Sequence, residues 1–269
     1  MILVNGRCAD TVDARDRGLA YGDGVFRTLR TQAGQPLWWR DQYDKLAADC
    51  AALGLDCPDE GGLLAEVCQA AEGGEGVVKI VLTRGASARG YARTIGQACT
   101  RIVMAVPLPP HARPDAPVDV TVRWCDLRLA RQPRLAGIKH LNRLENVLAR
   151  AEWDDRSIAE GLLCDDSGAV IGGVMSNLLL AKGRELFTPD LSQCGVAGVA
   201  RTRLLRAVAR RGIRVHVERL PSAAILAADE VMLCNSVIGV RRVARLDDVT
   251  WSPAGWTEIL KTALYEDVD

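Results

Sequence analysis

Short stretches of alternating apolar and polar positions occur in the first hundred residues, beside stretches with an apolar residue at every third or fourth position. Alternation is typical of strands and the wider spacing of helices, because side chains on one face of each element repeat in these ways. We predict strands at residues 2–4, 25–31, 77–82 and 101–106. We predict one helix with an apolar stripe from Tyr43 to Leu53, ended by Gly54, and a second at residues 60–72.

The pattern after residue 118 predicts mainly strands, with fewer helices. Strands are expected at 118–124, 161–164, 169–171, 177–181, 185–188, 213–218 and 229–234. The sequence Asp165-Asp166-Ser167-Gly168 reads as a hairpin turn between two of them. Helices are predicted after Gly198 and near the end of the chain, within residues 253–265. The fold class is therefore α/β (α+β).

A further helix is predicted directly after Lys139. Its apolar positions are Leu141, Leu144, Leu148 and Ala151. Asn142 is expected to be the N-cap, with Glu145 completing a capping box. A lysine fixed between Gly137 and a capped helix loses much of its freedom, and a held amine can act in catalysis. On local pattern alone, a solvated surface lysine remains the commoner case.

A proline-rich stretch, with five prolines in residues 107–117, is the best candidate for a domain boundary. We predict a small N-terminal domain at residues 1–106, a linker at 107–117 and a larger C-terminal domain at 118–269. Ligand sites often lie between two such lobes.

Composition and charge narrow the classes of function. The 34 basic residues balance the 34 acidic ones, so no overall field attracts nucleic acid or a membrane, and a small-molecule substrate is favoured. The nine cysteines are scattered without a C-x-x-C pair, and the three histidines lack helical spacing, so we expect neither a disulfide framework nor a metal site. No leader or membrane-spanning stretch is recognised, and we expect a reduced, cytoplasmic protein.

Several polar groups could bind anions. The glycines of residues 195–198 precede a helix, whose free amides suit phosphate, and Ser236 follows a predicted strand end. Thr28 and Arg30 share one face of the strand at 25–31, and Arg84 and Arg89 lie in the loop after the strand at 77–82. Each of these features also has a purely structural explanation. Residues 195–198 could be only a glycine-rich helix start, the strand at 25–31 an edge strand with its arginines in water, and the segment with Arg84 and Arg89 an exposed basic loop.

The chain resembles the class IV aminotransferases, the fold-type IV enzymes that use pyridoxal 5'-phosphate, and the resemblance runs nearly end to end. It rests on residues 21–26, 83–85, 89–91, 137–145, 176–178, 195–198 and 229–236. It implies a small α/β domain and a larger domain with a β-barrel-like core, usually paired as a homodimer. The same resemblance implies that the cofactor lies between the lobes.

The resemblance also suggests residue roles. Lys139 matches the lysine that forms a Schiff base with the cofactor and then acts as a base, and Val199, Ala200 and Ser236 match phosphate-binding positions. Lys45 stands where the family often has a phosphate-binding arginine. As substrate-binding residues the resemblance suggests Arg89, and the strand pattern adds Thr28 and Arg30.

One position departs from the family pattern. The glutamate that usually pairs with the pyridine nitrogen would fall at Gly172. A transaminase needs that partner, whereas a lyase that forms an aromatic ring gains driving force from aromatisation. We therefore expect a lyase of folate biosynthesis that acts through an aldimine to convert 4-amino-4-deoxychorismate into 4-aminobenzoate and pyruvate. The alternatives are a D-amino acid or branched-chain amino acid aminotransferase, and a non-catalytic relative.

Overall fold

The computed structural model describes residues 1–92 and 96–266 and separates the chain into two units. Unit 1 consists of Met1–Pro110 together with Ile138–Asn142, and unit 2 of His111–Gly137 and Arg143–Asp269. The division at Pro110 lies within the predicted linker. Residues 138–142, which the sequence-based division assigns to the second domain, group with the first. We refer to Ile138–Asn142 as the lysine segment.

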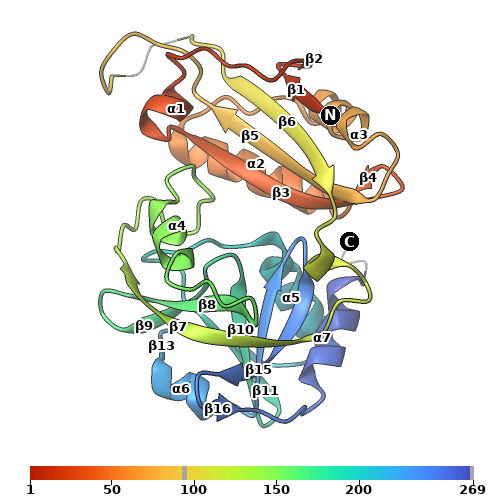
Figure 1. Cartoon of the computed structure of the whole chain (residues 1–269), viewed down its shortest axis with the longest axis vertical. Coiled ribbons are helices and arrows are strands. Elements are labelled where there is room, and N and C mark those ends of the chain that lie inside the picture. Colours follow the sequence, from red (N-terminus) through yellow and green to blue (C-terminus); the bar gives the residue numbers. More distant parts are fainter. Residues whose placement is uncertain (93–95, 267–269) are drawn as a thin grey trace. The chain divides into compact units, whose positions relative to one another are not determined.

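Unit 1 is built on an antiparallel six-stranded sheet of order β2-β1-β6-β5-β3-β4 (Figure 1). Its strands are β1 (Ile2–Val4), β2 (Arg7–Cys8), β3 (Gly24–Gln32), β4 (Gln35–Pro36), β5 (Gly76–Thr83) and β6 (Thr100–Pro107). A turn at Asn5-Gly6 joins β1 to β2, and both residues have positive φ, 50° and 78°. These are the conformations that a tight hairpin turn of this type requires.

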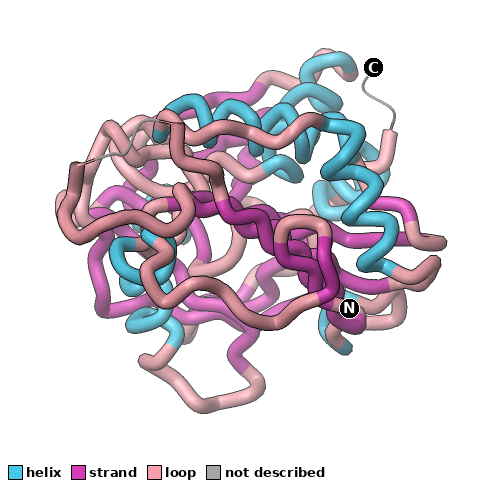
Figure 2. The backbone as a smooth tube through the Cα atoms, turned by 90° about the horizontal axis from the view of Figure 1, so that it is seen from above, coloured by secondary structure: helices cyan, strands magenta, loops and turns pink. Residues whose placement is uncertain are grey.

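Helices cover one face of this sheet. They are α2 (Trp39–Leu53) and α3 (Glu60–Ala71), while a short α1 (Arg17–Tyr21) precedes β3. Their apolar stripes meet the inward side chains of the strands in one core, which includes Leu29, Leu46, Val67 and Ile80. The loop from β5 toward β6 has no helix or strand between Arg84 and Ala92 and is pink in Figure 2.

The lysine segment adds to the sheet of unit 1 from a distant part of the sequence. His140 forms an antiparallel bridge with Val25, the amide of Phe26 donates to the carbonyl of Lys139 (2.9 Å), and the amide of Leu141 donates to Gly24 (3.0 Å). Ile138 is buried in the same core. The segment therefore pairs with the first residues of β3, along an edge of that strand that would otherwise be open.

Unit 2 contains a ten-stranded sheet. Its main path runs β12 (Val215–Glu218), β11 (Glu185–Pro189), β10 (Asn177–Lys182), β14 (Glu230–Asn235), β15 (Gly239–Leu246), β7 (Asp119–Leu129), β8 (Ile158–Asp165), β9 (Ala169–Gly173) and β13 (Leu220–Pro221), and β16 (Val249–Thr250) pairs with β15. The two ends of this path, β12 and β13, are joined by the single residue Arg219. The sheet is therefore a nearly closed barrel, which confirms the predicted fold class and barrel-like core.

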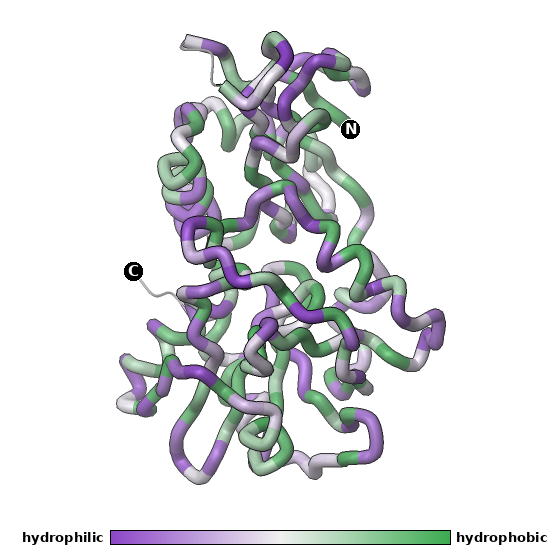
Figure 3. The backbone as a smooth tube through the Cα atoms, turned by 90° about the vertical axis from the view of Figure 1, so that its left-hand side faces the viewer, coloured by the Kyte–Doolittle hydropathy of each residue, from purple (hydrophilic) through white to green (hydrophobic). Residues whose placement is uncertain are grey.

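Apolar side chains fill the barrel of unit 2, and helices cover its outside. In Figure 3, hydrophobic stretches in green alternate with hydrophilic stretches in purple along the backbone. The interior includes Leu162, Leu178, Val231 and Val243. The helices are α4 (Leu144–Arg150), α5 (Val199–Arg210), α6 (Ser222–Leu226) and α7 (Trp256–Leu264), and a 3-10 turn occupies Pro110–Ala112. Among the described residues, no helix is both long and apolar enough to cross a membrane.

The predicted start and buried face of the helix after Lys139 are wrong. The N-cap of α4 is Arg143 without a side-chain cap, because Asn142 donates to the carbonyl of Gly22 instead (3.1 Å). Glu145 accepts from the amide of Ala130 (2.8 Å) rather than from the residue at 142. Leu144 and Leu148, predicted to be buried, are 74% and 59% exposed. Pattern reasoning also missed α1 and the long strand β15.

Candidate active site

Lys139 is half-buried, and both its main-chain amide and its carbonyl are hydrogen-bonded. Its amide donates to the Oδ2 atom of Asp49 (3.1 Å), and its carbonyl accepts from Phe26. Its Nζ atom lies 4.4 Å from the centre of the Phe26 ring, a favourable cation–π distance. The amine is therefore directed over the face of β3 that carries Phe26.

Thr28 and Arg30 lie on the same face of β3 as Phe26, because side chains alternate along a strand. Both are half-buried, whereas Val25, Arg27 and Leu29 on the opposite face are buried under the helices. The Nη2 atom of Arg30 is 4.0 Å from a carboxylate oxygen of Glu75. The structure thus places two of the predicted substrate-binding residues on the face over which the Lys139 amine extends.

Asp49 in α2 is a site residue that sequence reasoning missed. Only 2% of it is exposed, and its carboxylate forms ion pairs with Arg27 of β3 and with Lys45, one turn earlier in α2. Burial lowers the pKa of Arg27 to about 10. Burial, followed by the charges of Arg27 and Lys139, lowers the pKa of Lys45 to about 7. Lys45, predicted to bind phosphate, therefore lies in a charged cluster with Lys139.

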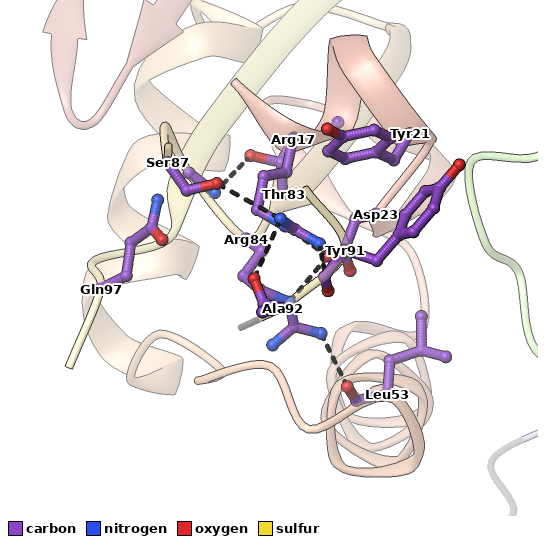
Figure 4. Close-up of polar contacts among 12 residues, drawn as sticks. Arg17, Tyr21, Asp23, Leu53, Thr83, Arg84, Ser87, Tyr91, Ala92 and Gln97 are labelled. Atoms are coloured by element: carbon purple, nitrogen blue, oxygen red, sulfur yellow. Dashed lines mark hydrogen bonds and ion pairs between the residues drawn. The ribbon is translucent and has the colours of Figure 1, made fainter. Parts of the chain in front are cut away.

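Arg84, one of the basic residues of the loop after β5, has a structural role (Figure 4). Its guanidinium donates to Asp23 (2.8 Å) and to the carbonyls of Leu53 (2.8 Å) and Gly54 (2.6 Å), at the end of α2. Arg17 donates to the same Asp23 oxygen and to carbonyls of the loop at residues 90–92. The two arginines fix the loop that carries Arg89.

Arg89 itself is exposed, and no hydrogen bond or ion pair ties its guanidinium to another described residue. The loop therefore presents an exposed cation on a backbone that Arg17 holds at residues 90–92. This position is compatible with the predicted role in binding a substrate carboxylate.

The start of α5 in unit 2 has the predicted character of an anion site. Gly198 is the N-cap and provides no side-chain cap, and its own amide donates to Asn177 (3.1 Å). Val199 and Ala200 follow and are buried. The main-chain amides of Val199 and Ala200 are the first of the helix, and they donate to no acceptor among the described residues. Buried donors at a helix start suit a bound anion.

Ser236 lies directly after β14, as predicted. The preceding residue, Asn235, shapes the turn: its Oδ1 atom accepts from the amides of Val237 (2.8 Å) and Ile238 (2.9 Å), and its side-chain amide donates to Met175 (3.1 Å). The half-buried Ser236 is thus held in a defined turn at the end of a central strand of unit 2.

Gly172, where the resemblance leads one to expect a glutamate, has a backbone conformation that favours glycine. Its φ is 156°, and a Cβ atom there would lie 2.9 Å from the carbonyl oxygen of Ser176. A carboxylate does occur close by: Glu160 in β8, 5% exposed, packs where a Cβ on Gly173 would fall. Sequence reasoning missed this residue, although a glutamate beside a run of apolar strand residues was a signal.

Glu160 is held by neutral donors. It accepts from the Ser176 hydroxyl (3.0 Å) and from the amides of Met175 (3.2 Å) and Gly161 (3.3 Å). Burial raises the pKa of Glu160 to about 7, against the effect of these hydrogen bonds. Glu160 therefore fixes the turn between β9 and β10.

Comparisons with known proteins agree on the family of the chain. The family model of the class IV amino-transferases matches residues 24–246. An aminodeoxychorismate lyase from Vibrio harveyi is 35% identical over 245 residues, which are 91% of this chain and 90% of the relative. The crystal structure of a 4-amino-4-deoxychorismate lyase from Pseudomonas aeruginosa is 42% identical, with a TM-score of 0.93 and 99% of each chain covered.

A more distant structure shows likeness of fold alone. It is a hypothetical aminotransferase from Mycobacterium tuberculosis in a PLP-bound form, 21% identical with a TM-score of 0.82, and the match covers 98% of this chain and 97% of that one.

Proposed function

Because the chain belongs to the class IV amino-transferase family, we propose that it is a lyase that converts 4-amino-4-deoxychorismate into 4-aminobenzoate and pyruvate. The similarity to the lyases of Vibrio harveyi and Pseudomonas aeruginosa over nearly the whole chain supports this reaction. The observation that carries the proposal is the position of Lys139. Its main chain is fixed by hydrogen bonds, and its amine extends over the face of β3 that also carries Thr28 and Arg30.

The residues fit pyridoxal phosphate, on which this family depends. The cofactor has an aldehyde and a phosphate, and the chain offers an amine at Lys139 and buried amides at Val199 and Ala200 that need an acceptor. We propose that Lys139 holds the aldehyde and that these two amides, with Ser236 and Lys45, hold the phosphate. When bound, the cofactor supplies an electron-accepting ring attached to the substrate nitrogen.

The chain's own part in the reaction is to position the substrate and move a proton. Lys139 removes the proton from C4, the carbon that bears the amino group. The bond from C3 to the ether oxygen then breaks, the ring becomes aromatic, and the departing enolpyruvyl group gains a proton to give pyruvate. Arg30 and Arg89, with Thr28, would bind the two carboxylates of the substrate.

The absence of a carboxylate at Gly172 fits an elimination better than a transamination. Aromatisation drives this elimination, so less stabilisation is required from the cofactor ring than when an amino group is transferred. Gly172 has a φ of 156°, a backbone conformation that residues other than glycine rarely adopt. The position is therefore not adapted to a glutamate.

The test is to supply purified protein and pyridoxal phosphate with 4-amino-4-deoxychorismate and to follow 4-aminobenzoate fluorescence and pyruvate. We expect both products in equal amounts, and none from Lys139→Ala. Lys79→Ala is a matched control, because the Lys79 amine also lies near the Phe26 ring, at 5.2 Å, and should leave product formation intact. Glutamate formed from an amino acid and 2-oxoglutarate, without 4-aminobenzoate, would favour an aminotransferase. A protein that binds no cofactor would be a non-catalytic relative.

We also propose that the protein is a homodimer. An exposed apolar face on α4 supports this assembly, since Leu144, Val147 and Leu148 are 74%, 60% and 59% exposed and lie on neighbouring turns. Such a face is unusual on an isolated protein. Light scattering should give twice the chain mass of 29.1 kDa, and Leu148→Asp should reduce it to that mass. A native mass of 29.1 kDa would contradict the proposal.

The same proposal includes a cytoplasmic location and a small-molecule substrate. All nine cysteines are free in the structure, which suits a compartment that keeps thiols reduced. Cell fractionation with antibody detection should find the protein with cytoplasmic markers, and recovery with an oxidising compartment would contradict this location.

A further inference from the structure

Asp49 joins three segments of unit 1 that are distant in sequence. Its Oδ2 atom accepts from the Lys139 amide (3.1 Å) and from Arg27 of β3, while its Oδ1 atom accepts from Lys45 in its own helix. The helix, the strand and the lysine segment therefore share one buried carboxylate. A carboxylate has about four acceptor positions, so three donors are readily accommodated.

We propose that Asp49 is a positioning residue for Lys139: it fixes the main chain of the lysine and balances the positive charges of Arg27 and Lys45 beside the lysine amine. The inference rests on the proposed function, because it assigns Asp49 a role only if Lys139 holds the cofactor. It goes beyond that function by identifying the residue that sets the electrostatic environment of the Lys139 amine.

A second ion pair in α2 shows why the position of Asp49 matters. Arg40 and Asp44 have the same spacing as Lys45 and Asp49, but Arg40 and Asp44 are largely exposed, with side chains 74% and 57% accessible. Water screens an exposed pair, which therefore contributes little. Asp49 is almost fully buried, and there its charge acts strongly on its neighbours.

The cluster around Asp49 contains more positive than negative charge. Arg27 and Lys45 are ion-paired to it, Lys139 adds a third cation when protonated, and Lys139 already contributes to the lowered pKa of Lys45. Cys50, the next residue in α2, also acts on Arg27, and the Lys79 amine of β5 lies over the same Phe26 ring as the Lys139 amine. Removing the Asp49 carboxylate would take away the negative charge that is paired with Arg27 and Lys45.

The test measures how the cofactor-free protein captures pyridoxal phosphate as a function of pH. Absorbance gives the pH of half-maximal capture, and borohydride reduction with peptide mapping shows whether Lys139 carries the label. Asp49→Asn removes the charge but retains an oxygen for the Lys139 amide. We expect its midpoint to move to lower pH by about one unit or more, because a cluster without the carboxylate favours the neutral amine.

Lys45→Gln provides the opposite test. It removes a cation and leaves the Asp49 charge to act on Lys139, so we expect the midpoint to move to higher pH. General damage to the structure does not move the midpoint in opposite directions for two neighbouring substitutions. Asp44→Asn, in the exposed pair of the same helix, should leave the midpoint unchanged.

Each outcome decides between the two proposals. If native protein carries no label on Lys139, the cofactor role in the proposed function fails. If native protein is labelled but Asp49→Asn and Lys45→Gln both keep the native midpoint, or shift it in the same direction, only the role of Asp49 fails. Should Asp49→Asn not fold, Lys45→Gln decides: an unchanged or lower midpoint overturns the inference.

Discussion

Two buried carboxylates, Asp49 in unit 1 and Glu160 in unit 2, have opposite environments. Asp49 in unit 1 is paired with Arg27 and Lys45. Glu160 in unit 2 has no ion pair with a described residue and is bound by the Ser176 hydroxyl and main-chain amides. The first acid is ion-paired with two cations, whereas burial raises the pKa of Glu160 to about 7, so that it is partly protonated at neutral pH.

The difference reflects what each unit contributes. Unit 1 presents charged side chains around Lys139, and a buried counter-charge is needed to keep them together. Unit 2 presents main-chain amides at the start of α5, and Glu160 only has to fix a turn. The partners of a buried acid, rather than its burial, therefore decide whether it acts as a charge.

The strongest way to break this comparison is Asp49→Ala. We expect a loss of about 3–5 kcal/mol in the free energy of unfolding, because Arg27 would remain buried without a partner. Urea denaturation measures this loss. The matched substitution Asp44→Ala should cost no more than about 1 kcal/mol. Equal losses for the two variants would show that burial of Asp49 has no special consequence.

Glu160→Gln tests the other acid through the pH dependence of stability. A folded-state pKa raised from 4.5 to about 7 means that the folded protein binds the proton more tightly than the unfolded chain, so this residue makes stability fall as pH rises through that interval. The fall is at most about 3 kcal/mol. Denaturation of Glu160→Gln at pH 5 and pH 8 should lack this contribution. An identical pH dependence in both proteins would show that Glu160 is charged throughout.

Gly172→Glu sharpens the comparison by adding a carboxylate to unit 2. We expect a loss of about 1–3 kcal/mol from backbone strain, and more if the added charge finds no partner. Gly172→Ala bears the strain without the charge, so the difference between the two melting curves isolates the carboxylate. If Gly172→Glu is as stable as the native protein, the backbone at 172 accommodates a side chain after all.

The smallest expected effect is that of Ser176→Ala, which removes one donor from Glu160. The loss should be about 1 kcal/mol at pH 8, where the carboxylate is mostly ionised, and smaller at pH 5. Thermal melts at the two pH values measure it. A larger loss at pH 5 would indicate that the Ser176 hydroxyl serves the protonated acid instead.

Local features of the fold were predictable from the sequence. Gly54 ends α2 in the left-handed conformation, and the turn at residues 165–168 joins β8 to β9. Both depend on a few adjacent residues. Lys139 could be proposed as a site residue because its neighbours resemble a known family, and the start of α5 as an anion site because helix starts preceded by glycines have a recognisable composition.

Features that depend on distant partners were not predicted. The capping box failed because Asn142 bonds to Gly22, which no local pattern indicates. The Arg27–Asp49 pair did leave a signal: Arg27 alternates with the buried Val25 and Leu29, and Asp49 falls on the apolar stripe of α2, three residues after Leu46. Two opposite charges at core positions predict a buried ion pair, but only once the strand and helix are known to pack together.

The pairing of the lysine segment with β3 also affects the order in which the protein can be completed during synthesis. Residues 1–110 leave the ribosome before Ile138–Asn142, so until then the strand at Gly24–Phe26 has an open edge. Open edges promote association between chains. The residues that bring Lys139 to unit 1 are also those that close this edge, so a nascent chain gains this lysine and covers the open strand in the same step.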